Sequence, residues 1–373
     1  MLQARGWGAR QLLRPWLVVL ALSLVYVGAT LVRHDGDPLS FALVGTRYSQ
    51  GDPDGTPGYD GQFAYFIARQ PLQGWRFCDV PAYRYQRILY PLLSWALALG
   101  RPGAAPWTLI LVNLAAVAVG TWFTEQLLAS HGVSRWYALG YGLYGGLVAG
   151  LRLNLNEPLA YALVQAGLWA WADRRTSLST AMLALAGLAK ETALIAVGGL
   201  GLYLLLEGRW RELLVLGLGV AGPFAAWQGA LWVWLGRPGV GTGGAMATPF
   251  ELIPFAGLAR TATVSWPAFW LLVAIEGPLF VLPAVWACVR SARELFRGQR
   301  HPWTAILLMQ AAVLPFLPFS TWREPLAIAR LATGLVSATL LYGALRRSRR
   351  LLNLSLVWLS TLALLVNESQ LPV

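Results

Sequence analysis

Long apolar runs are the feature that most constrains this chain. Stretches of about 20 apolar residues, the length that crosses the hydrocarbon core of a bilayer, recur from Trp16 to Val366 between short connectors that contain arginine. Of the 373 residues, 57% are hydrophobic and only 12% are charged, a composition too apolar for a soluble globular protein. The sequence therefore predicts an all-α, polytopic membrane protein with a single integral-membrane domain over residues 1–373.

Arginine carries almost all of the positive charge. The chain has 29 lysine and arginine residues against 17 acidic ones, and Lys190 is its only lysine. The arginines cluster in short connectors, where they determine topology because basic loops stay on the cytoplasmic side. The net charge of +12 is therefore a membrane signal, and we expect membrane lipids but no nucleic acid among the partners. The basic connectors lie at 5–14, 131–135, 173–175, 207–212, 290–300 and 346–350.

A topology follows if these connectors are cytoplasmic. The N-terminus is then cytoplasmic, the first apolar run is an uncleaved helix, and about eleven transmembrane helices follow. Residues 33–105 become an extracytoplasmic first loop, and residues 236–267 become an extracytoplasmic Gly-rich loop. The expected helices lie near 15–32, 106–129, 136–152, 158–172, 177–190, 192–206, 212–235, 268–289, 303–319, 330–345 and 351–366.

Two apolar segments do not fit simple spans. Residues 88–100 are too few to cross a bilayer, so they are expected to form a juxtamembrane helix within the first loop. Residues 177–206 have cytoplasmic arginines at both ends and would be about 45 Å long as one helix. This second segment must therefore turn back, and the polar pair Lys190-Glu191 marks the turn.

Asp60 stands in the longest polar stretch, residues 33–87, which holds six of the 17 acids. Turn-forming residues precede it and an apolar run follows, so Asp60 is expected at the start of an interfacial helix. It either caps that helix or acts as a general base, because an aspartate is ionised at neutral pH and can take a proton from a sugar hydroxyl. Its neighbours Tyr59 and Gln62 are candidate substrate-binding residues.

Two further groups of charges lie at predicted membrane surfaces. Arg84 and Arg87 flank Tyr85 directly before the juxtamembrane segment, where they fit either snorkelling anchors or a site for a lipid phosphate. Lys190 and Glu191 would each cost about 2.5 to 3.5 kcal/mol at mid-membrane depth unless they face a polar cavity. They fit either structural ion pairs with other helices or a phosphate-binding lysine with an orienting glutamate.

Two later segments add candidates on the extracytoplasmic side. Glu157 precedes a proline in a polar connector, where it either caps the next helix or contacts substrate or a metal. Trp322, Arg323 and Arg330 lie in a Pro-rich break between two late helices. Their guanidinium groups fit phosphate and the indole fits a sugar ring, with interfacial anchoring as the alternative.

Metal binding is left open by the sequence. Residues 35–37 and 52–54 match the D-x-D pattern of metal–nucleotide sites, but aspartate beside glycine or proline is ordinary turn chemistry. The histidines have no ligand spacing, and the glycine-rich run at 239–244 lacks the ending of a P-loop. A divalent ion, Mg²⁺ or Mn²⁺, is the cofactor under consideration.

In their order along the chain these motifs resemble the GT-C superfamily of polyprenyl-phosphate-sugar-dependent glycosyltransferases. The chain looks closest to a branch of bacterial cell-surface glycopolymer formation. The resemblance implies that Asp60 matches the first-loop carboxylate that such enzymes use as base or metal ligand. It also implies that Lys190 and the pair Arg84 and Arg87 engage the lipid phosphate. The matching segments are Tyr59-Asp60-Gly61-Gln62, Arg84-Tyr85-Gln86-Arg87-Ile88-Leu89-Tyr90-Pro91 and Ala189-Lys190-Glu191-Thr192.

The expected function is an inverting transfer of a sugar from a polyprenyl-phosphate donor. The acceptor would be a cell-surface glycan, lipid or protein on the outer face of a bacterial plasma membrane. One alternative is a flippase or transporter of lipid-linked glycans, in which Lys190-Glu191 would be a coupling pair. Transporters usually carry inverted repeats, and the sequence shows none. The other alternative is a polymerase or ligase of surface glycans.

Overall fold

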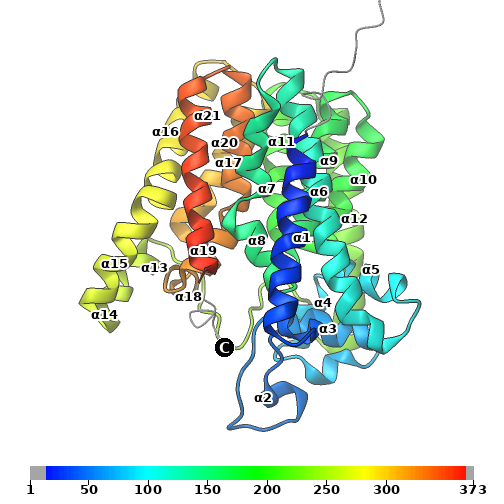
Figure 1. The fold of residues 1–373 in the computed structure, drawn as a ribbon. Coiled ribbons are helices and arrows are strands. Elements are labelled where there is room, and N and C mark those ends of the chain that lie inside the picture. The colour runs from blue at the N-terminus through cyan, green and yellow to red at the C-terminus, as the bar shows by residue number, and fades with distance from the viewer. Residues whose placement is uncertain (1–13, 367–373) are drawn as a thin grey trace, which may run out of the picture.

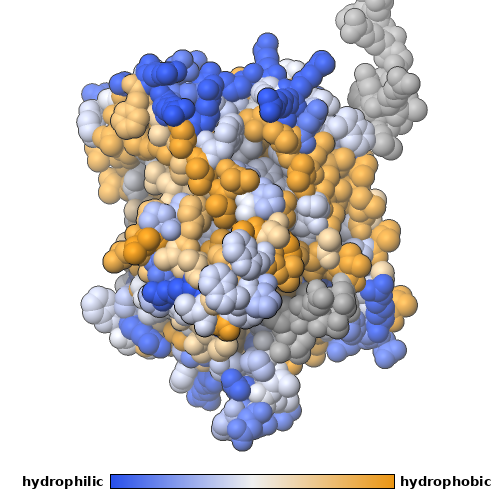
Figure 2. Space-filling model, turned by 90° about the vertical axis from the view of Figure 1, so that its left-hand side faces the viewer, coloured by the Kyte–Doolittle hydropathy of each residue, from blue (hydrophilic) through white to orange (hydrophobic). Residues whose placement is uncertain are grey.

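The computed structural model describes residues 14–366, and this part of the chain is all-helical, with no β-strand. The helices stand roughly side by side and form a bundle with two ends (Figure 1). On the face shown in Figure 2, a broad apolar band crosses the middle of the molecule, and polar residues gather at both ends. The prediction of an all-α protein with an apolar, membrane-compatible exterior is confirmed.

Four helical segments are long and apolar enough to cross a membrane. A fifth candidate is a pair of helices, α19 (Pro325–Leu331) and α20 (Thr333–Leu345), which is bent by 47° between its members. Among the described residues, length and composition therefore identify four or five candidate spans, and the predicted count of about eleven is not confirmed. The four are α1 (Pro15–Arg33), η4 (Pro102–Ala104) with α6 (Ala105–Ser130), α12 (Trp210–Leu235), and α15 (Trp266–Glu276) continued through η7 (Gly277–Val281) and α16 (Leu282–Phe296).

Two expected helices are broken into short pieces. Residues 136–152 were expected as one span, but they form η5 (Arg135–Ala138), α7 (Leu139–Gly142) and α8 (Gly145–Arg152). Close packing at Gly145 accompanies the break. The amide of Gly145 donates a hydrogen bond to Thr361 Oγ1, and a Cβ on Gly145 would lie only 2.5 Å from that oxygen. The last expected helix, 351–366, is α21 (Arg349–Ser355) followed by the 3₁₀ helix η9 (Leu356–Leu365).

The predicted turn within residues 177–206 is present. Helix α10 (Thr176–Ala189) packs along α9 (Glu157–Ala172) and ends directly before Lys190, whose backbone is extended. The chain continues through η6 (Glu191–Ala193) into α11 (Leu194–Leu206), which packs against α17 (Pro302–Val313). The break therefore places Lys190 between two helices instead of inside one.

The basic connectors lie together at one end, which we call the arginine-rich end. Arg300 donates a hydrogen bond to the Leu206 carbonyl oxygen at 2.6 Å, and Arg347 donates one to the His131 carbonyl oxygen at 3.1 Å. The Arg209 guanidinium lies 5.7 Å from the ring of Trp171, next to connector 173–175. These contacts bring connectors that are far apart in sequence to one face. The first connector, 5–14, lies outside the described residues except for its last position.

The opposite end, the loop end, carries the first loop and the Gly-rich loop. Helix α5 is short and juxtamembrane in length, as predicted, whereas α3 is buried along almost its whole length and is not the interfacial helix that was expected. The first loop contains η2 (Pro38–Phe41), α2 (Thr46–Ser49), α3 (Gly61–Arg69), η3 (Gly74–Phe77), α4 (Pro81–Tyr85) and α5 (Leu89–Leu97). The Gly-rich loop ends in α13 (Ala256–Ala259) and α14 (Thr261–Val264), near η8 (Leu314–Phe316) and α18 (Phe319–Trp322).

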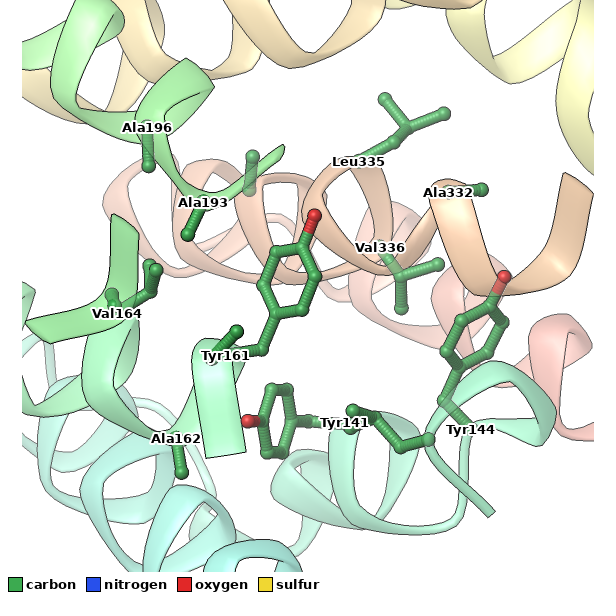
Figure 3. Close-up of a cluster of buried hydrophobic side chains, with 14 of the residues drawn as sticks. Tyr141, Tyr144, Tyr161, Ala162, Val164, Ala193, Ala196, Ala332, Leu335 and Val336 are labelled. Atoms are coloured by element: carbon green, nitrogen blue, oxygen red, sulfur yellow. The ribbon is translucent and has the colours of Figure 1, made fainter. Parts of the chain in front are cut away.

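The centre of the bundle is filled by aromatic and small side chains. Tyr141, Tyr144 and Tyr161 are all buried and come from α7, the α7–α8 connection and α9 (Figure 3). The Tyr144 hydroxyl donates to the carbonyl oxygen of Ala329 in α19. This packing links the broken segment 136–152, the third of the expected spans, to the late helices.

The two ends should face opposite sides of a membrane, because the apolar band separates them. In a variant whose cysteines are replaced (Cys78→Ala and Cys288→Ala), a single cysteine is introduced by Asp54→Cys at the loop end or by Ser134→Cys at the arginine-rich end. Both positions are exposed. A membrane-impermeant maleimide added to intact cells should label the first variant only. Labelling of both would contradict the two-ended fold, and labelling of the second alone would reverse the predicted orientation.

Candidate functional site

Side chains from distant parts of the sequence form one network of ion pairs at the loop end, which we call the charged cluster. The network draws on the first loop, the start of α9, the α10–α11 turn and the region of α19. Five of its ten members are buried and the other five are partly buried. They are Tyr59, Asp60, Asp79, Arg84, Arg87, Glu157, Lys190, Glu191, Glu324 and Arg330.

Arg330 is the centre of the charged cluster. Its Nε donates to Glu157 Oε1 at 2.7 Å, its Nη1 to the Tyr59 hydroxyl at 2.7 Å, and its Nη2 to Asp60 Oδ2 at 3.2 Å. The Tyr59 hydroxyl donates in turn to Glu324 Oε1 at 2.6 Å. One guanidinium therefore ties together the first loop, the start of α9 and the late helices. Only a planar side chain with several donors can make three such bonds at once.

The backbone explains why Arg330 and Glu157 meet. Arg330 lies in the last turn of α19, directly before the bend into α20, and Thr333 caps its carbonyl oxygen at 2.7 Å. Glu157 opens α9, followed by Pro158 in the first turn, where proline fits and where a carboxylate is favoured by the helix dipole. Both side chains thus project from helix ends into the space between the helices.

Asp60 is partly exposed, with 34% of its side chain accessible, and does not cap α3. Its carboxylate accepts from Arg84 Nη1 at 2.8 Å and from Arg330 Nη2 at 3.2 Å, while no amide of α3 donates to it. Burial favours the neutral acid, but the guanidinium groups of Arg84 and Arg330 outweigh that effect and hold the pKa of Asp60 well below its usual range. In this arrangement Asp60 is an ionised carboxylate of weak basicity.

Arg84 is held on three sides. Its Nε and Nη2 donate to the two carboxylate oxygens of Asp79 at 2.7 and 2.8 Å, a bidentate pair. Its Nη1 reaches Asp60, and its guanidinium carbon lies 4.0 Å from the ring centroid of Phe63. Asp79 also accepts from the amide of Ala245 at 2.9 Å, so the Gly-rich loop closes over this pair.

Lys190 is buried and paired, and it faces no open cavity. Its side chain is 4% exposed, and its Nζ donates to Glu157 Oε1 at 2.6 Å. Glu157 therefore receives two cations on one oxygen, because Arg330 contacts the same atom. The other oxygen, Glu157 Oε2, is buried and has no hydrogen-bond partner among the described residues. This free acceptor is unusual, since buried polar atoms are nearly always satisfied.

Arg87 pairs with Glu191, the residue after Lys190. Its Nε donates to Glu191 Oε2 at 2.8 Å and its Nη2 contacts Glu191 Oε1, with a further bond from Nη2 to the Tyr83 hydroxyl at 2.6 Å. Asn156 fastens the same region by donating to the carbonyl oxygens of Arg87 and Ala189 at 3.2 and 3.1 Å. The first loop is thereby attached to the α10–α11 turn.

A pocket opens between these groups. Asp60, Arg84, Arg87, Glu157 and Arg330 line it together with apolar side chains of α3. Its free volume is about 20 Å³, which is room for about one water molecule. A substrate with a phosphate and a sugar therefore enters only if some ion pairs of the charged cluster separate.

Two residues of the Tyr-Asp-Gly-Gln segment have structural roles. A Cβ on Gly61 would lie 2.0 Å from the carbonyl oxygen of Leu153, so only glycine permits this close approach of α3 to the α8–α9 connection. Gln62 is buried; its Oε1 accepts from the amide of Gly45 at 3.1 Å and its Nε2 donates to the Pro57 carbonyl oxygen at 2.7 Å. In this structure Gln62 holds the preceding loop and offers nothing to a substrate.

Three other expected site residues lie outside the pocket. Tyr85 is fully buried and donates to the Pro71 carbonyl oxygen at 2.8 Å. Trp322 is also fully buried, with its ring 6.0 Å from that of Phe255, so it presents no open face to a sugar. Arg323 is exposed and does not line the pocket, and its guanidinium carbon lies 5.7 Å from the ring centroid of Phe319.

Sequence reasoning missed three members or neighbours of the cluster. Asp79 was visible only as one of the six acids of the first loop, and Tyr83 carried no signal apart from its position beside Arg84 and Arg87. Glu324 stood next to Arg323 in the Pro-rich break. The partner of Glu324 is Tyr59, 265 positions earlier in the chain. Asp79 and Tyr83 lie only five and four residues before their partners Arg84 and Arg87, but whether such neighbours touch depends on how the first loop folds.

The described residues contain no group of three or more His, Cys, Asp or Glu side chains placed to hold a metal ion. The carboxylates of the charged cluster contact arginine and lysine instead. The donor set therefore does not fit the Mg²⁺ or Mn²⁺ ion that was considered, and no residue is assigned to it.

Comparison with known proteins adds no relative. The chain matches no family model, no curated protein and no solved structure. The charged cluster and its position at the end of apolar helices are the features that bear on function.

Gly61→Ala should destabilise the protein, because the new methyl group would overlap the Leu153 carbonyl oxygen. Overpacking of this kind typically costs about 1 to 3 kcal/mol. Gly103→Ala is the matched control in the same loop, since its Cβ would meet nothing within 4 Å. Thermal unfolding of the purified variants should show a lower midpoint for the first only. Equal midpoints would contradict the close approach of α3 to the α8–α9 connection.

The stability contributed by Asp60 should depend on pH. Because its pKa is depressed in the folded protein, its ion pairs stabilise fully above the ordinary carboxyl pKa of about 4 and lose their effect as the pH falls below it. Asp60→Asn should therefore unfold at a lower temperature than wild type at neutral pH, and the difference should shrink towards about pH 3. A difference that is the same at both pH values would exclude the depressed pKa.

Proposed function

We propose that the chain is a membrane glycosyltransferase that uses a polyprenyl-phosphate sugar as donor. One observation carries the proposal: a carboxylate, Asp60, shares a pocket with the guanidinium groups of Arg84, Arg87 and Arg330 at the end of a bundle of apolar helices. A lipid-linked sugar phosphate needs both kinds of group, cations for its phosphate and a base for the acceptor. Its lipid tail also needs an apolar surface beside the pocket.

The phosphate of the donor would bind to the guanidinium groups that face the pocket. Arg84 and Arg330 already hold an anion, the Asp60 carboxylate, with the geometry that suits a phosphate oxygen. Arg330 is also fixed by Glu157 and Tyr59, so it is preorganised. Lys190 acts indirectly in this scheme: it is paired with Glu157 and adds positive charge behind the site.

Binding of the phosphate would also activate Asp60. When phosphate oxygens take over the donors of Arg84 and Arg330, the carboxylate loses the contacts that keep its pKa low. Its pKa then rises towards the range in which it can accept a proton from a hydroxyl group. This order of events couples the activity of the base to the presence of the donor and explains why the pocket is nearly closed before the donor arrives.

The reaction would be a single displacement with inversion. The acceptor hydroxyl oxygen bonds to the anomeric carbon of the sugar, and the bond from that carbon to the phosphate oxygen breaks. The hydroxyl proton passes to Asp60, and the polyprenyl phosphate leaves with its charge stabilised by Arg84, Arg87 and Arg330. Glu157 lines the pocket, and its unpartnered Oε2 would accept a hydrogen bond from a sugar hydroxyl once the pocket opens. We place this chemistry on the outer face of a bacterial plasma membrane, opposite the arginine-rich end.

One observation favours the rival function, a transporter of lipid-linked glycans. Glu276 lies inside the long helical segment Trp266–Phe296, is fully buried, and neither of its carboxylate oxygens has a partner among the described residues. An unpaired carboxyl group within a span is typical of proton-coupled transport. It also directly precedes the π-helical turn η7, a feature often found at functional sites.

The transfer assay separates these functions. Purified protein in lipid is incubated with radiolabelled polyprenyl-phosphate hexoses and a cell-envelope acceptor fraction, and label that becomes covalently bound to acceptor is measured. Asp60→Asn should lower the rate by about 10²- to 10⁴-fold, the usual contribution of a general base. Asp54→Asn, an exposed acid of the same loop, should leave the rate unchanged.

Two outcomes would contradict the proposal. A rate that is undiminished in Asp60→Asn would remove the base assignment. Movement of lipid-linked glycan across the membrane by wild type, without formation of any new glycosidic bond and with loss of movement in Glu276→Gln, would favour the transporter instead.

A further inference from the structure

A second hollow lies at the loop end, on the other side of α4 from the charged cluster. Trp75 and Trp234 form part of its walls, with Pro81 and Ala82 of α4 and with Leu235 and Arg237 at the end of α12. It is far roomier than the site pocket, with a free volume of about 290 Å³. We call it the tryptophan cleft. None of its lining residues belongs to the charged cluster.

The tryptophan cleft opens beside exposed apolar surface of a helix that could cross a membrane. Helix α12 is apolar and long enough to span, and its last turn exposes Val233 to 91% and Trp232 to 64%. On the side of the first loop, Leu72 is 80% exposed. Side chains of this kind are stable against lipid and unfavourable against water. Tryptophans at such a position are typical of the boundary between the hydrocarbon and the headgroups.

Two arginines at the tryptophan cleft have no acidic partner among the described residues. Arg237 follows Gly236, whose left-handed backbone ends α12, and its side chain is exposed in the wall of the cleft. Arg76 is also exposed, with its guanidinium carbon 5.5 Å from the ring of Trp75. The nearby acid Asp79 is engaged by Arg84 and by the amide of Ala245. The cleft is therefore positively charged and suits an anion.

We propose that the tryptophan cleft binds an anionic phospholipid of the surrounding leaflet, with its phosphate on Arg237 and its acyl chains along the exposed face of α12. An arginine presents its donors in the geometry that phosphate oxygens require. The exposed apolar face of α12 beside the cleft favours a ligand with hydrocarbon chains, which a soluble phosphate or a free glycan lacks. This inference does not depend on the proposed enzymatic function.

The bound lipid would also hold the first residues of the Gly-rich loop, at Arg237, in place. From Arg237 the loop crosses α4: Gly239 lies so close to Ala82 that a Cβ would be 2.5 Å from its carbonyl oxygen. It then reaches the charged cluster, where the amide of Ala245 donates to Asp79. Residues 237–245 thus connect the tryptophan cleft to the part of the Gly-rich loop that closes over the Arg84–Asp79 pair. Lipid in the cleft would hold this segment down on α4.

Native mass spectrometry and hydrogen exchange test the proposal on the full chain. The protein is placed in nanodiscs of phosphatidylcholine, with or without an equal share of phosphatidylglycerol. A retained phosphatidylglycerol adduct is expected, together with slower amide exchange in residues 237–248. Arg237→Gln should weaken retention by about fivefold, the effect of one interfacial arginine on an anionic lipid, and should abolish the slowing of exchange. Trp75→Ala should also weaken retention.

Arg101→Gln is the matched control, because Arg101 is an exposed arginine at the loop end, like Arg237, but belongs to the first loop and lies outside the tryptophan cleft. It should bind phosphatidylglycerol like wild type. Equal weakening in Arg101→Gln and Arg237→Gln would show diffuse attraction of anionic lipid and would overturn the site. Equal retention of phosphatidylcholine and phosphatidylglycerol by wild type would overturn it as well. Neither readout requires sugar transfer, so failure here is distinct from failure of the proposed enzyme.

Discussion

The contact between Arg330 and Glu157 is the interaction on which the loop end depends. Both groups are buried, and the same Glu157 oxygen also receives Lys190. Buried ions are tolerated only when they are paired and hydrogen-bonded, and removal of one partner typically destabilises a protein by about 3 to 5 kcal/mol. The first loop, the start of α9, the α10–α11 turn and α19 are therefore held together by charges that cannot be removed singly. Tyr59 and Asp60 join this network through the same guanidinium.

This arrangement turns the first loop into part of the bundle. Helix α3 is packed against α5 and α6, and Gly61 allows it to touch the backbone at Leu153. Asp60 is thereby presented to a pocket and to two arginines, and it has no role as a helix cap. The nearly closed pocket and the depressed pKa of Asp60 have the same cause, the ion pairs with Arg84 and Arg330. An anionic ligand that competes for these arginines would open the pocket and make the carboxylate more basic in one step.

Much of the fold could be predicted from sequence, because apolar runs, arginine connectors and the polar pair Lys190-Glu191 report directly on a membrane environment. The broken segment 136–152 was not predicted, since hydropathy is blind to the close packing that its glycines allow. Asp60, Glu157 and Arg330 were found as charges in apolar surroundings. Their pairing was not, because it joins residues up to 270 positions apart. Trp322 was predicted to contact a sugar because an indole in a Pro-rich break looks accessible from the sequence. Tertiary packing buries it instead.

We propose that Arg84 and Arg330 exchange the Asp60 carboxylate for the phosphate of a lipid-linked sugar. An experimental structure of the protein with a non-reactive polyprenyl-phosphonate sugar tests this most directly, through the position of the phosphorus atom. We predict that the phosphonate oxygens lie within hydrogen-bonding distance, about 3 Å, of both guanidinium groups, and that Asp60 has separated from at least one of them. A phosphonate seated elsewhere, with both ion pairs of Asp60 intact, would contradict the account.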